Sequence, residues 1–521
     1  MEYLMKRHWL PRIPLVALFG LLAITMWFWW IYTEAFVSDD SYFYLVTARH
    51  LALTGEQTFS GVYTTNGLHP LWLYALTAYT WVLAWFSQDA VHHVAFAVPL
   101  SGLFLITGAL LLWRAARRLA LPPDFIVIPA VAFVAIFGVL YSEAHLLFFA
   151  AALLILIVVG TDRNRISAYL LIGVANAVLI LSRLDAVFWI GPLLFWLWLL
   201  DRSQLRVALS AAMTAALVAP YLVANLAFFG GPMPVSGLLK SSFPDIFWGR
   251  GWETYTIPSI SWEGYSVPFG FVPLTICIVA ILAIGRKRLK KATVPEWSLV
   301  WVFAGGTALH CLYIVLFTKF HTTWYWYYVL PVIGGCIALA AVAEAVRIPH
   351  RLLSIGVLVV VALAVSGLVV DKSTEGVTGR PAYVLEYLNR YEITNRTILI
   401  SDYPGAVAFH SDNRIVAADM LTGNIALTER LRNSDNALKE LWAVTEEEGY
   451  PIDLVVFAGN GWLVPDVSGR CLEYRDPRDF PDLRPFGWLR VPEPVYRSGP
   501  YTIVWSMDDI NSSVGAAWER C

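Results

Sequence analysis

Long apolar segments recur from the start of the chain to about residue 370, and they constrain its fold more than any other feature. A helix needs roughly 20 apolar residues to cross a bilayer, and runs of about this length recur in the chain. With 58% hydrophobic and 15% charged residues, the chain is far more apolar than a soluble domain. The sequence therefore predicts a polytopic α-helical membrane protein. The twelve candidate segments are Ile13–Phe36, Pro70–Phe86, Val94–Trp113, Phe125–Tyr141, Ala144–Gly160, Ile166–Leu181, Val187–Leu200, Val207–Phe229, Pro268–Ile284, Trp297–Phe317, Trp324–Val346 and Leu352–Val370.

Basic residues between these segments indicate which segments cross the membrane, because short cytoplasmic loops are enriched in arginine and lysine. If Pro70–Phe86 crosses, five basic loops fall outside the cytoplasm; if it lies along the outer interface, all five fall inside. We therefore expect about eleven transmembrane helices, a juxtamembrane helix at Pro70–Phe86 and a cytoplasmic N-terminus in the plasma (inner) membrane. The basic residues of these loops are Arg114, Arg117, Arg118, Arg163, Arg165, Arg202, Arg206, Arg286, Lys287, Arg288, Lys290, Lys291, Arg347 and Arg351.

The composition becomes polar from Asp371 onward. Thr397–Ser401 and Leu454–Ala458 have the pattern of buried strands, and Pro381–Tyr391 and Asn436–Gly449 that of helices. The alternation predicts a small α/β domain over residues 371–521, outside the cytoplasm, after a transmembrane domain over residues 1–370. Cys471 and Cys521 in this region could pair in an oxidising compartment. The net charge of −2 says nothing about a partner, but the sequence has no concentrated basic surface, so no nucleic-acid partner is expected.

An acidic pair, Asp39-Asp40, follows the first apolar segment directly. Carboxylates at a membrane edge are costly, so this position favours a functional role. Ser38 is placed to cap a helix that starts here, and the helix dipole should keep both acids ionised. We expect one of them to act as a general base toward an acceptor hydroxyl. The alternative is an acid pair that only caps the helix.

A polar loop, Thr65–Trp72, follows in the same outer region. His69 could donate to a phosphate or a sugar hydroxyl, Asn66 could join it, and Trp72 could stack on a sugar face. The alternative is a polar turn followed by a tryptophan that anchors the chain at the interface.

Further charged residues fall in the predicted outer turns. Glu143, close to His145, has no evident local partner and is a candidate for substrate binding. Arg183 and Asp185 are expected to pair with each other.

Lys240, Lys319 and His321 are candidate cations for a phosphate. Trp324 and Tyr325 open an aromatic segment that either lines the substrate site or anchors the protein in lipid.

Together these features resemble the GT-C superfamily, whose members are glycosyltransferases that use polyprenyl-phosphate sugars. Protein O-mannosyltransferases, the lipid A aminoarabinose transferase and cell-wall arabinofuranosyltransferases are examples. The resemblance covers residues 1–370 and rests mainly on Asp39-Asp40 with Thr65–Trp72, supported by Gly230–Lys240. It implies juxtamembrane helices in the first outer loop and an aspartate base there. Leu71 stands where mannosyltransferase relatives have the second proline of His-Pro-Pro, which leaves the sugar and the acceptor open.

The expected activity is transfer of a sugar from a polyprenyl-phosphate donor to a hydroxyl of a glycan, lipid or protein acceptor on the extracytoplasmic side. Asp39 or Asp40 would be the base, and Lys240, Lys319 or His321 would hold the leaving phosphate. Some relatives use a divalent cation and others do not; Asp39 and Asp40 are the ligands to consider. The alternatives are a transporter or flippase of a lipid-linked or polar substrate, and a membrane-anchored glycan-binding module.

The eleven-helix topology places Arg288 in the cytoplasm. In a variant whose five native cysteines are replaced by serine, a single cysteine introduced as Arg288→Cys should react with a membrane-impermeant maleimide only after the cells are permeabilised. Labelling in intact cells would contradict this topology.

Overall fold

The structure is a computed structural model, and the statements below concern the residues it describes. These are residues 12–137, 140–162, 164–200, 203–246, 259–262, 265–268, 276, 296–318, 325–346, 380–458, 463–465, 471–474, 487–491, 494, 496–498 and 502–506.

The chain divides into two compact units, each built from separate stretches of sequence. The first unit contains Met1–Phe36, Ala97–Ala219 and Phe243–Thr374. The second unit contains Val37–Phe96, Pro220–Ser242 and Glu375–Cys521. The segment with the acidic pair, which the sequence predicts to be an outer loop, thus belongs to the same unit as the C-terminal region. The expected domain boundary near residue 370 stays a prediction.

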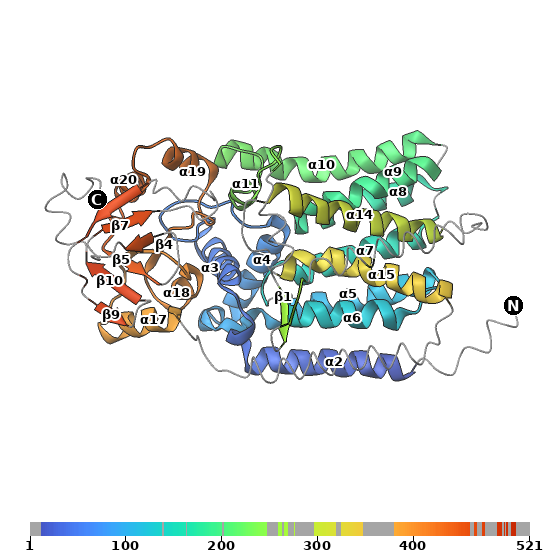
Figure 1. Cartoon of the computed structure of the whole chain (residues 1–521), viewed down its shortest axis with the longest axis horizontal. Coiled ribbons are helices and arrows are strands. Elements are labelled where there is room, and N and C mark those ends of the chain that lie inside the picture. The colour runs from blue at the N-terminus through green and yellow to red at the C-terminus, as the bar shows by residue number, and fades with distance from the viewer. Residues whose placement is uncertain are drawn as a thin grey trace, which may run out of the picture. The chain divides into compact units, whose positions relative to one another are not determined.

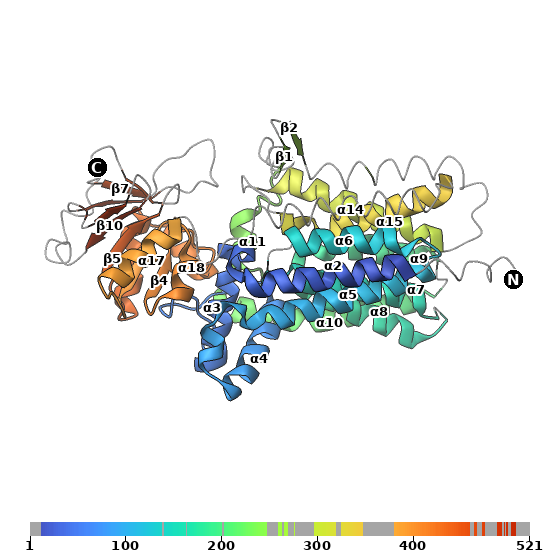
Figure 2. The same ribbon diagram turned by 90° about the horizontal axis from the view of Figure 1, so that it is seen from below.

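The first unit is a bundle of apolar helices whose axes run alongside one another in both ribbon views (Figures 1 and 2). Small residues let some of these helices pack closely. Gly108 of α5 lies so near Phe148 of α7 that a Cβ would come within 2.7 Å of the phenylalanine ring. The helices are α2 (Arg12–Ile31), α5 (Val98–Arg118), α6 (Pro123–Phe137), α7 (Ala144–Gly160), α8 (Ile166–Ser182), α9 (Val187–Leu200), α14 (Glu296–Phe317) and α15 (Val329–Val346). The long helix α10 (Gln204–Phe229) continues from the first unit into the second.

Three helices of the described part are long and apolar enough to cross a membrane: Val94–Arg118, Gln204–Phe229 and Trp326–Glu344. Six shorter apolar helices accompany them within the described ranges. A mostly helical membrane protein is therefore what the structure supports. The count of about eleven stays a prediction, because segment 352–370 and most of segment 268–284 lie outside the described residues. A short hairpin of β1 (Ser259–Trp262) and β2 (Tyr265–Pro268) was not expected.

Two helices of the first outer loop begin and end where local sequence signals place them. Ser38 caps α3 (Asp39–Thr54) by accepting a hydrogen bond from the Ser41 amide. Gly55 ends α3 in the left-handed conformation, with φ of 80°. Pro70 starts α4 (Pro70–Phe86), the expected juxtamembrane helix. Toward its end α4 exposes Trp81, Trp85 and Phe86, while Trp72, Leu73 and Leu76 are buried; its position relative to a membrane stays a prediction.

A five-stranded sheet in the order β4-β3-β5-β10-β9 forms the core of the C-terminal region. β3 (Thr397–Ile400), β4 (Arg414–Ala417) and β5 (Leu454–Phe457) are parallel, while β10 (Thr502–Ser506) is antiparallel to β5 and β9 (Tyr496–Ser498). Strands β3 and β5 match the two strands expected from sequence. Four helices accompany the sheet: α17 (Arg380–Arg390), α18 (Pro404–His410), α19 (Ile425–Arg432) and α20 (Ala437–Glu447).

A second, antiparallel sheet in the same region was not expected. It is formed by β6 (Leu463–Pro465), β7 (Cys471–Tyr474) and β8 (Gly487–Arg490). Cys471 is disulfide-bonded; Cys521 lies outside the described residues, so their pairing stays a prediction.

Hydrogen bonds from two distant segments hold the Thr65–Gly67 part of the first outer loop. The Asn66 side chain donates to the Met233 carbonyl and accepts from the Val235 amide, and its backbone N–H donates to the Gly423 carbonyl. Ser236, in the short helix α11 (Val235–Lys240), donates to the Gly67 carbonyl at 2.5 Å. The second unit is thus joined across residues far apart in sequence.

Gly67 is packed so tightly that any side chain would disturb this arrangement. A Cβ here would overlap with the Leu421 carbonyl oxygen. Gly67→Ala should therefore lower the Tm of the detergent-solubilised protein, in line with an overpacking cost of about 1–3 kcal/mol. Gly237→Ala in α11 is the matched control, because its Cβ would meet nothing within 4 Å. Equal Tm values for the two variants would contradict the packing described.

Candidate functional site

Asp39 at the start of α3 receives a hydrogen bond from the C-terminal region. The Ala406 amide, in the first turn of α18, donates to Asp39 Oδ1 at 2.9 Å. Burial raises the pKa of Asp39 well above its usual value; the Ala406 amide partly opposes this, and the nearby carboxylates of Asp40, Asp419 and Asp402 reinforce it. Burial thus shifts the Asp39 pKa in the direction opposite to the shift expected from the helix dipole, and the ionised state expected for the acid pair stays a prediction.

Two of these carboxylates come from the C-terminal sheet and were missed in the sequence. Asp402 follows β3 and Asp419 follows β4. Because β3 and β4 are parallel neighbours, their carboxyl ends meet at one edge of the sheet. Burial raises the pKa of Asp402 to about 7; the Tyr403 amide lowers it, Asp419 raises it, and Arg380, 3.7 Å away, lowers it. A carboxylate directly after a buried strand was the signal that could have identified Asp402.

Helix α18 lies against α3 through aromatic and charged side chains. The Tyr42 ring lies 5.4 Å from that of Phe409, and Tyr42 Oη lies 3.4 Å from His410 Nε2. The Arg49 guanidinium lies over the Phe409 ring at 5.0 Å and also hydrogen-bonds His92 Nδ1. Burial, reinforced by Arg49, lowers the pKa of His410 to about 4, so this histidine is neutral at pH 7. None of these contacts was expected from sequence.

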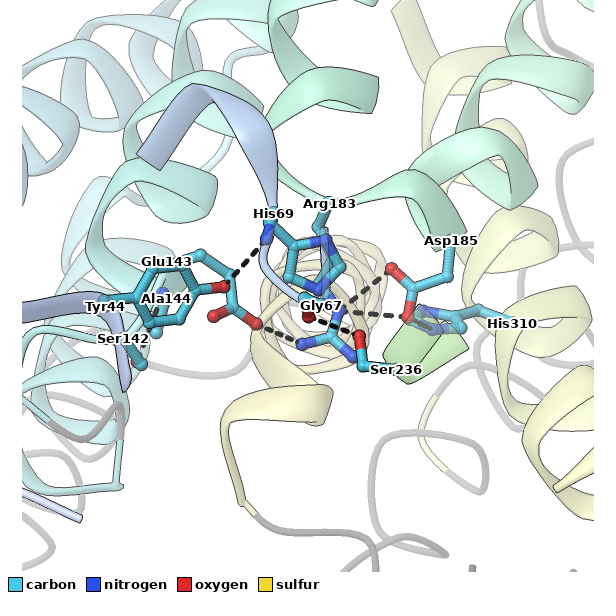
Figure 3. Close-up of polar contacts among 10 residues, drawn as sticks. All are labelled: Tyr44, Gly67, His69, Ser142, Glu143, Ala144, Arg183, Asp185, Ser236 and His310. Carbon is cyan, nitrogen blue, oxygen red and sulfur yellow. Dashed lines mark hydrogen bonds and ion pairs between the residues drawn. The ribbon is translucent and has the colours of Figure 1, made fainter. Parts of the chain in front are cut away.

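The residues predicted as substrate contacts in the Thr65–Trp72 loop mostly interact with other parts of the protein. The His69 amide donates to Tyr44 Oη at 3.1 Å, as Figure 3 shows, and the His69 side chain is half-buried. Trp72 is completely buried, so it offers no surface on which a sugar could stack. The Asn66 amide is engaged on both of its polar atoms. Lys240, the last residue of α11, is half-buried in the same unit.

The first unit contains a buried ionic cluster, centred on Arg183 between two carboxylates (Figure 3). Arg183 Nη1 lies 2.5 Å from Glu143 Oε1, and Arg183 Nε lies 2.9 Å from Asp185 Oδ1. His310 Nε2 lies 3.2 Å from Asp185 Oδ2, and the Arg183 guanidinium lies 4.0 Å from the centre of the Tyr327 ring. The Arg183–Asp185 pair was expected, but Glu143 does have a partner.

The remaining predicted residues are distributed as follows. His145, near the start of α7, is fully buried, with its ring edge-on to Trp29 at 4.9 Å. Tyr325 opens the short 3-10 helix η5 (Tyr325–Tyr328). Lys319, His321 and Trp324 lie outside the described residues.

The predicted residues that the structure describes are thus divided between the two units. Asp39, Asp40, Asn66, His69, Trp72 and Lys240 belong to the second unit, and Glu143, His145 and Tyr325 to the first. Within the described ranges, no three His, Cys, Asp or Glu side chains are arranged to hold a metal ion.

The Arg183 cluster yields a stability prediction. Arg183→Met leaves two buried carboxylates without their cation, so it should lower the free energy of unfolding by about 3–5 kcal/mol. The control is Arg165→Met, which removes an ion pair with Asp162 whose side chains are 76% and 52% exposed. That variant should lose about 0–1 kcal/mol. Denaturant unfolding in detergent measures both, and a small, equal loss would show that the Arg183 pairs add little.

Comparison with known proteins identifies solved structures with a similar fold. No protein-family model and no curated protein matches this sequence. Among solved structures, the oligosaccharyltransferase of Archaeoglobus fulgidus in its apo form is similar with a TM-score of 0.51 and 12% identity, over 86% of this chain and 70% of that one. ArnT from Cupriavidus metallidurans, bound to undecaprenyl phosphate, is similar with a TM-score of 0.52 and 14% identity, over 94% of this chain and 97% of ArnT. Both are GT-C superfamily members, so the resemblance inferred from the first outer loop is confirmed at the level of fold.

Proposed function

We propose that this protein is a membrane glycosyltransferase that moves a sugar from a polyprenyl-phosphate donor to an acceptor hydroxyl. The observation that carries the proposal is the similarity to undecaprenyl-phosphate-bound ArnT, which extends over 94% of the chain. The acidic pair directly after the first apolar segment supports it from the sequence. The acceptor would be a glycan, a lipid or a protein on the extracytoplasmic side of the plasma membrane, with the N-terminus in the cytoplasm.

Asp39 is the residue we propose as general base. Its carboxylate accepts the proton of the acceptor hydroxyl while the hydroxyl oxygen bonds to the anomeric carbon of the donor. The bond from that carbon to the phosphate oxygen breaks, and its electron pair leaves with the polyprenyl phosphate. A base works best when its pKa is close to the working pH. Burial that raises the Asp39 pKa therefore makes this carboxylate a stronger base than an exposed aspartate.

The leaving phosphate needs cations rather than an acid, because it departs as a stable anion. We propose Lys240, Lys319 and His321 for this role, since ammonium and imidazolium groups bind phosphate oxygens well. His69, Glu143, His145, Trp324 and Tyr325 remain proposed contacts to the substrates. For Asn66 and Trp72 the contacts support an indirect role, in which they hold the loop that carries His69. A divalent cation stays an open component of the mechanism.

The base proposal predicts the kinetics of an isosteric variant. Asp39→Asn keeps the shape of the side chain and removes the proton acceptor, so the single-turnover rate at saturating donor should fall by about 10²- to 10⁴-fold. Binding of the donor should persist, because the phosphate is held by other residues. A panel of labelled polyprenyl-phosphate sugars, presented to the purified protein in nanodiscs, provides the assay.

Two companion variants show whether the loss belongs to the base. Asp40→Asn removes the neighbouring carboxylate and should cost less. Lys240→Ala should weaken donor binding and leave the rate at saturating donor less affected. Near-normal turnover in both aspartate variants would refute the mechanism and leave the acid pair as a helix cap.

A further inference from the structure

We infer that the first turn of α18, through Gly405 and the Ala406 amide, positions the Asp39 carboxylate for its role as base. This inference rests on the function proposed above, and it gives the C-terminal region a part in the chemistry. Gly405 and Ala406 would be positioning residues, acting through Asp39 rather than on the substrate.

Close backbone contact is the first argument. The Ala406 N–H points at Asp39 Oδ1, 367 positions away in the sequence, at a donor–acceptor distance of 2.9 Å. A Cβ on Gly405 would overlap with the Asp39 carbonyl oxygen and come within 2.9 Å of both Asp39 Oδ1 and Tyr42 Cβ. Only glycine lets α18 approach α3 this closely.

The local chain geometry is the second argument. Tyr403, directly before α18, adopts the left-handed conformation, with φ of 57° and ψ of 40°. Residues with a side chain rarely adopt this conformation unless their surroundings impose it. Pro404 then fixes the first helical residue. The turn thus directs the free amides of the first turn of α18 toward α3.

The Ala406 amide is available for this contact without cost to α18. It is the third residue of the helix, and the first four amides of a helix have no carbonyl partner within it. Its hydrogen bond to Asp39 therefore satisfies a donor that would otherwise be unpaired. The same bond fixes the direction of the carboxylate, as a general base requires.

The charged groups around Asp39 show why the hydrogen bond from the Ala406 amide matters. Asp40, Asp419 and Asp402 all disfavour a negative charge on Asp39. Arg380 faces Asp402, and Arg49 lies by Phe409 and His410 farther along the contact. The Tyr403 hydroxyl also interacts electrostatically with Asp39. Among the described residues, the Ala406 amide favours the charged, basic form of Asp39 against these three carboxylates.

The direct test replaces the Ala406 amide by an ester, through nonsense suppression with L-lactic acid. The side chain is unchanged, and only the N–H is removed. Since hydrogen bonds to charged groups are strong, the acid limb of the pH profile of the transfer rate should move up by about one pH unit. The rate at pH 7 should fall, and the KM for the donor should stay unchanged. The sign follows because loss of the donor raises the Asp39 pKa further.

The matched control is the same ester substitution at Ala408. That amide is bonded within α18 in an ordinary helical pattern, so its loss weakens the helix more and leaves Asp39 untouched. It should not move the acid limb. Gly405→Ala provides an independent variant with the same expected shift.

The outcomes separate this inference from the proposed function. If Asp39→Asn abolishes transfer but the Ala406 ester leaves the rate and acid limb unchanged, the positioning role is wrong and the base stands. If the Ala408 ester shifts the acid limb equally, general loosening explains the effect, and the positioning role is again wrong. If the wild-type protein transfers no sugar, the proposed function itself fails.

Discussion

The hydrogen bond from the Ala406 amide to the half-buried Asp39 carboxylate connects the start of α3 to the C-terminal region within the second unit. A buried charge destabilises a protein unless hydrogen bonds or opposite charges compensate it. Here α3 supplies the acid, and the C-terminal region supplies both a compensating amide at Ala406 and opposing carboxylates at Asp402 and Asp419. Residues from the start and the end of the chain therefore meet at the Asp39 side chain.

The first unit also contains buried charged side chains, and there opposite charges compensate one another. Arg183 is buried with Glu143 and Asp185, and the Tyr327 ring lies against its guanidinium. Because each partner would be costly alone, the cluster ties α7, the α8–α9 turn, α14 and η5 together.

Local signals in the sequence predict much of the fold. Ser38 and Gly55 mark the ends of α3, Pro70 marks the start of α4, and the strands β3 and β5 appear as short apolar runs. These features were predictable because capping, proline geometry and strand patterns depend on residues a few positions apart. The similarity to GT-C structures was predictable for a related reason, since its motifs lie within one outer loop.

The contacts that complete the candidate site were not predictable in this way. Glu143 and its partner Arg183 are 40 residues apart, and Asp39 and Ala406 are 367 apart. No periodicity links such residues, so only the folded chain reveals them. The burial of Trp72 was also not predictable. The sequence does not show whether an aromatic side chain near an expected interface is exposed or, as for Trp72, fully buried.

The most direct test of the account is whether the purified protein makes a covalent glycoside. The wild-type protein in nanodiscs would be incubated with radiolabelled polyprenyl-phosphate sugars and candidate acceptors, and the products separated. The account predicts a labelled glycoside together with an equal amount of released polyprenyl phosphate. Movement of intact labelled donor across the membrane, or its binding with no product from any sugar tested, would contradict it and favour a transporter or a binding protein.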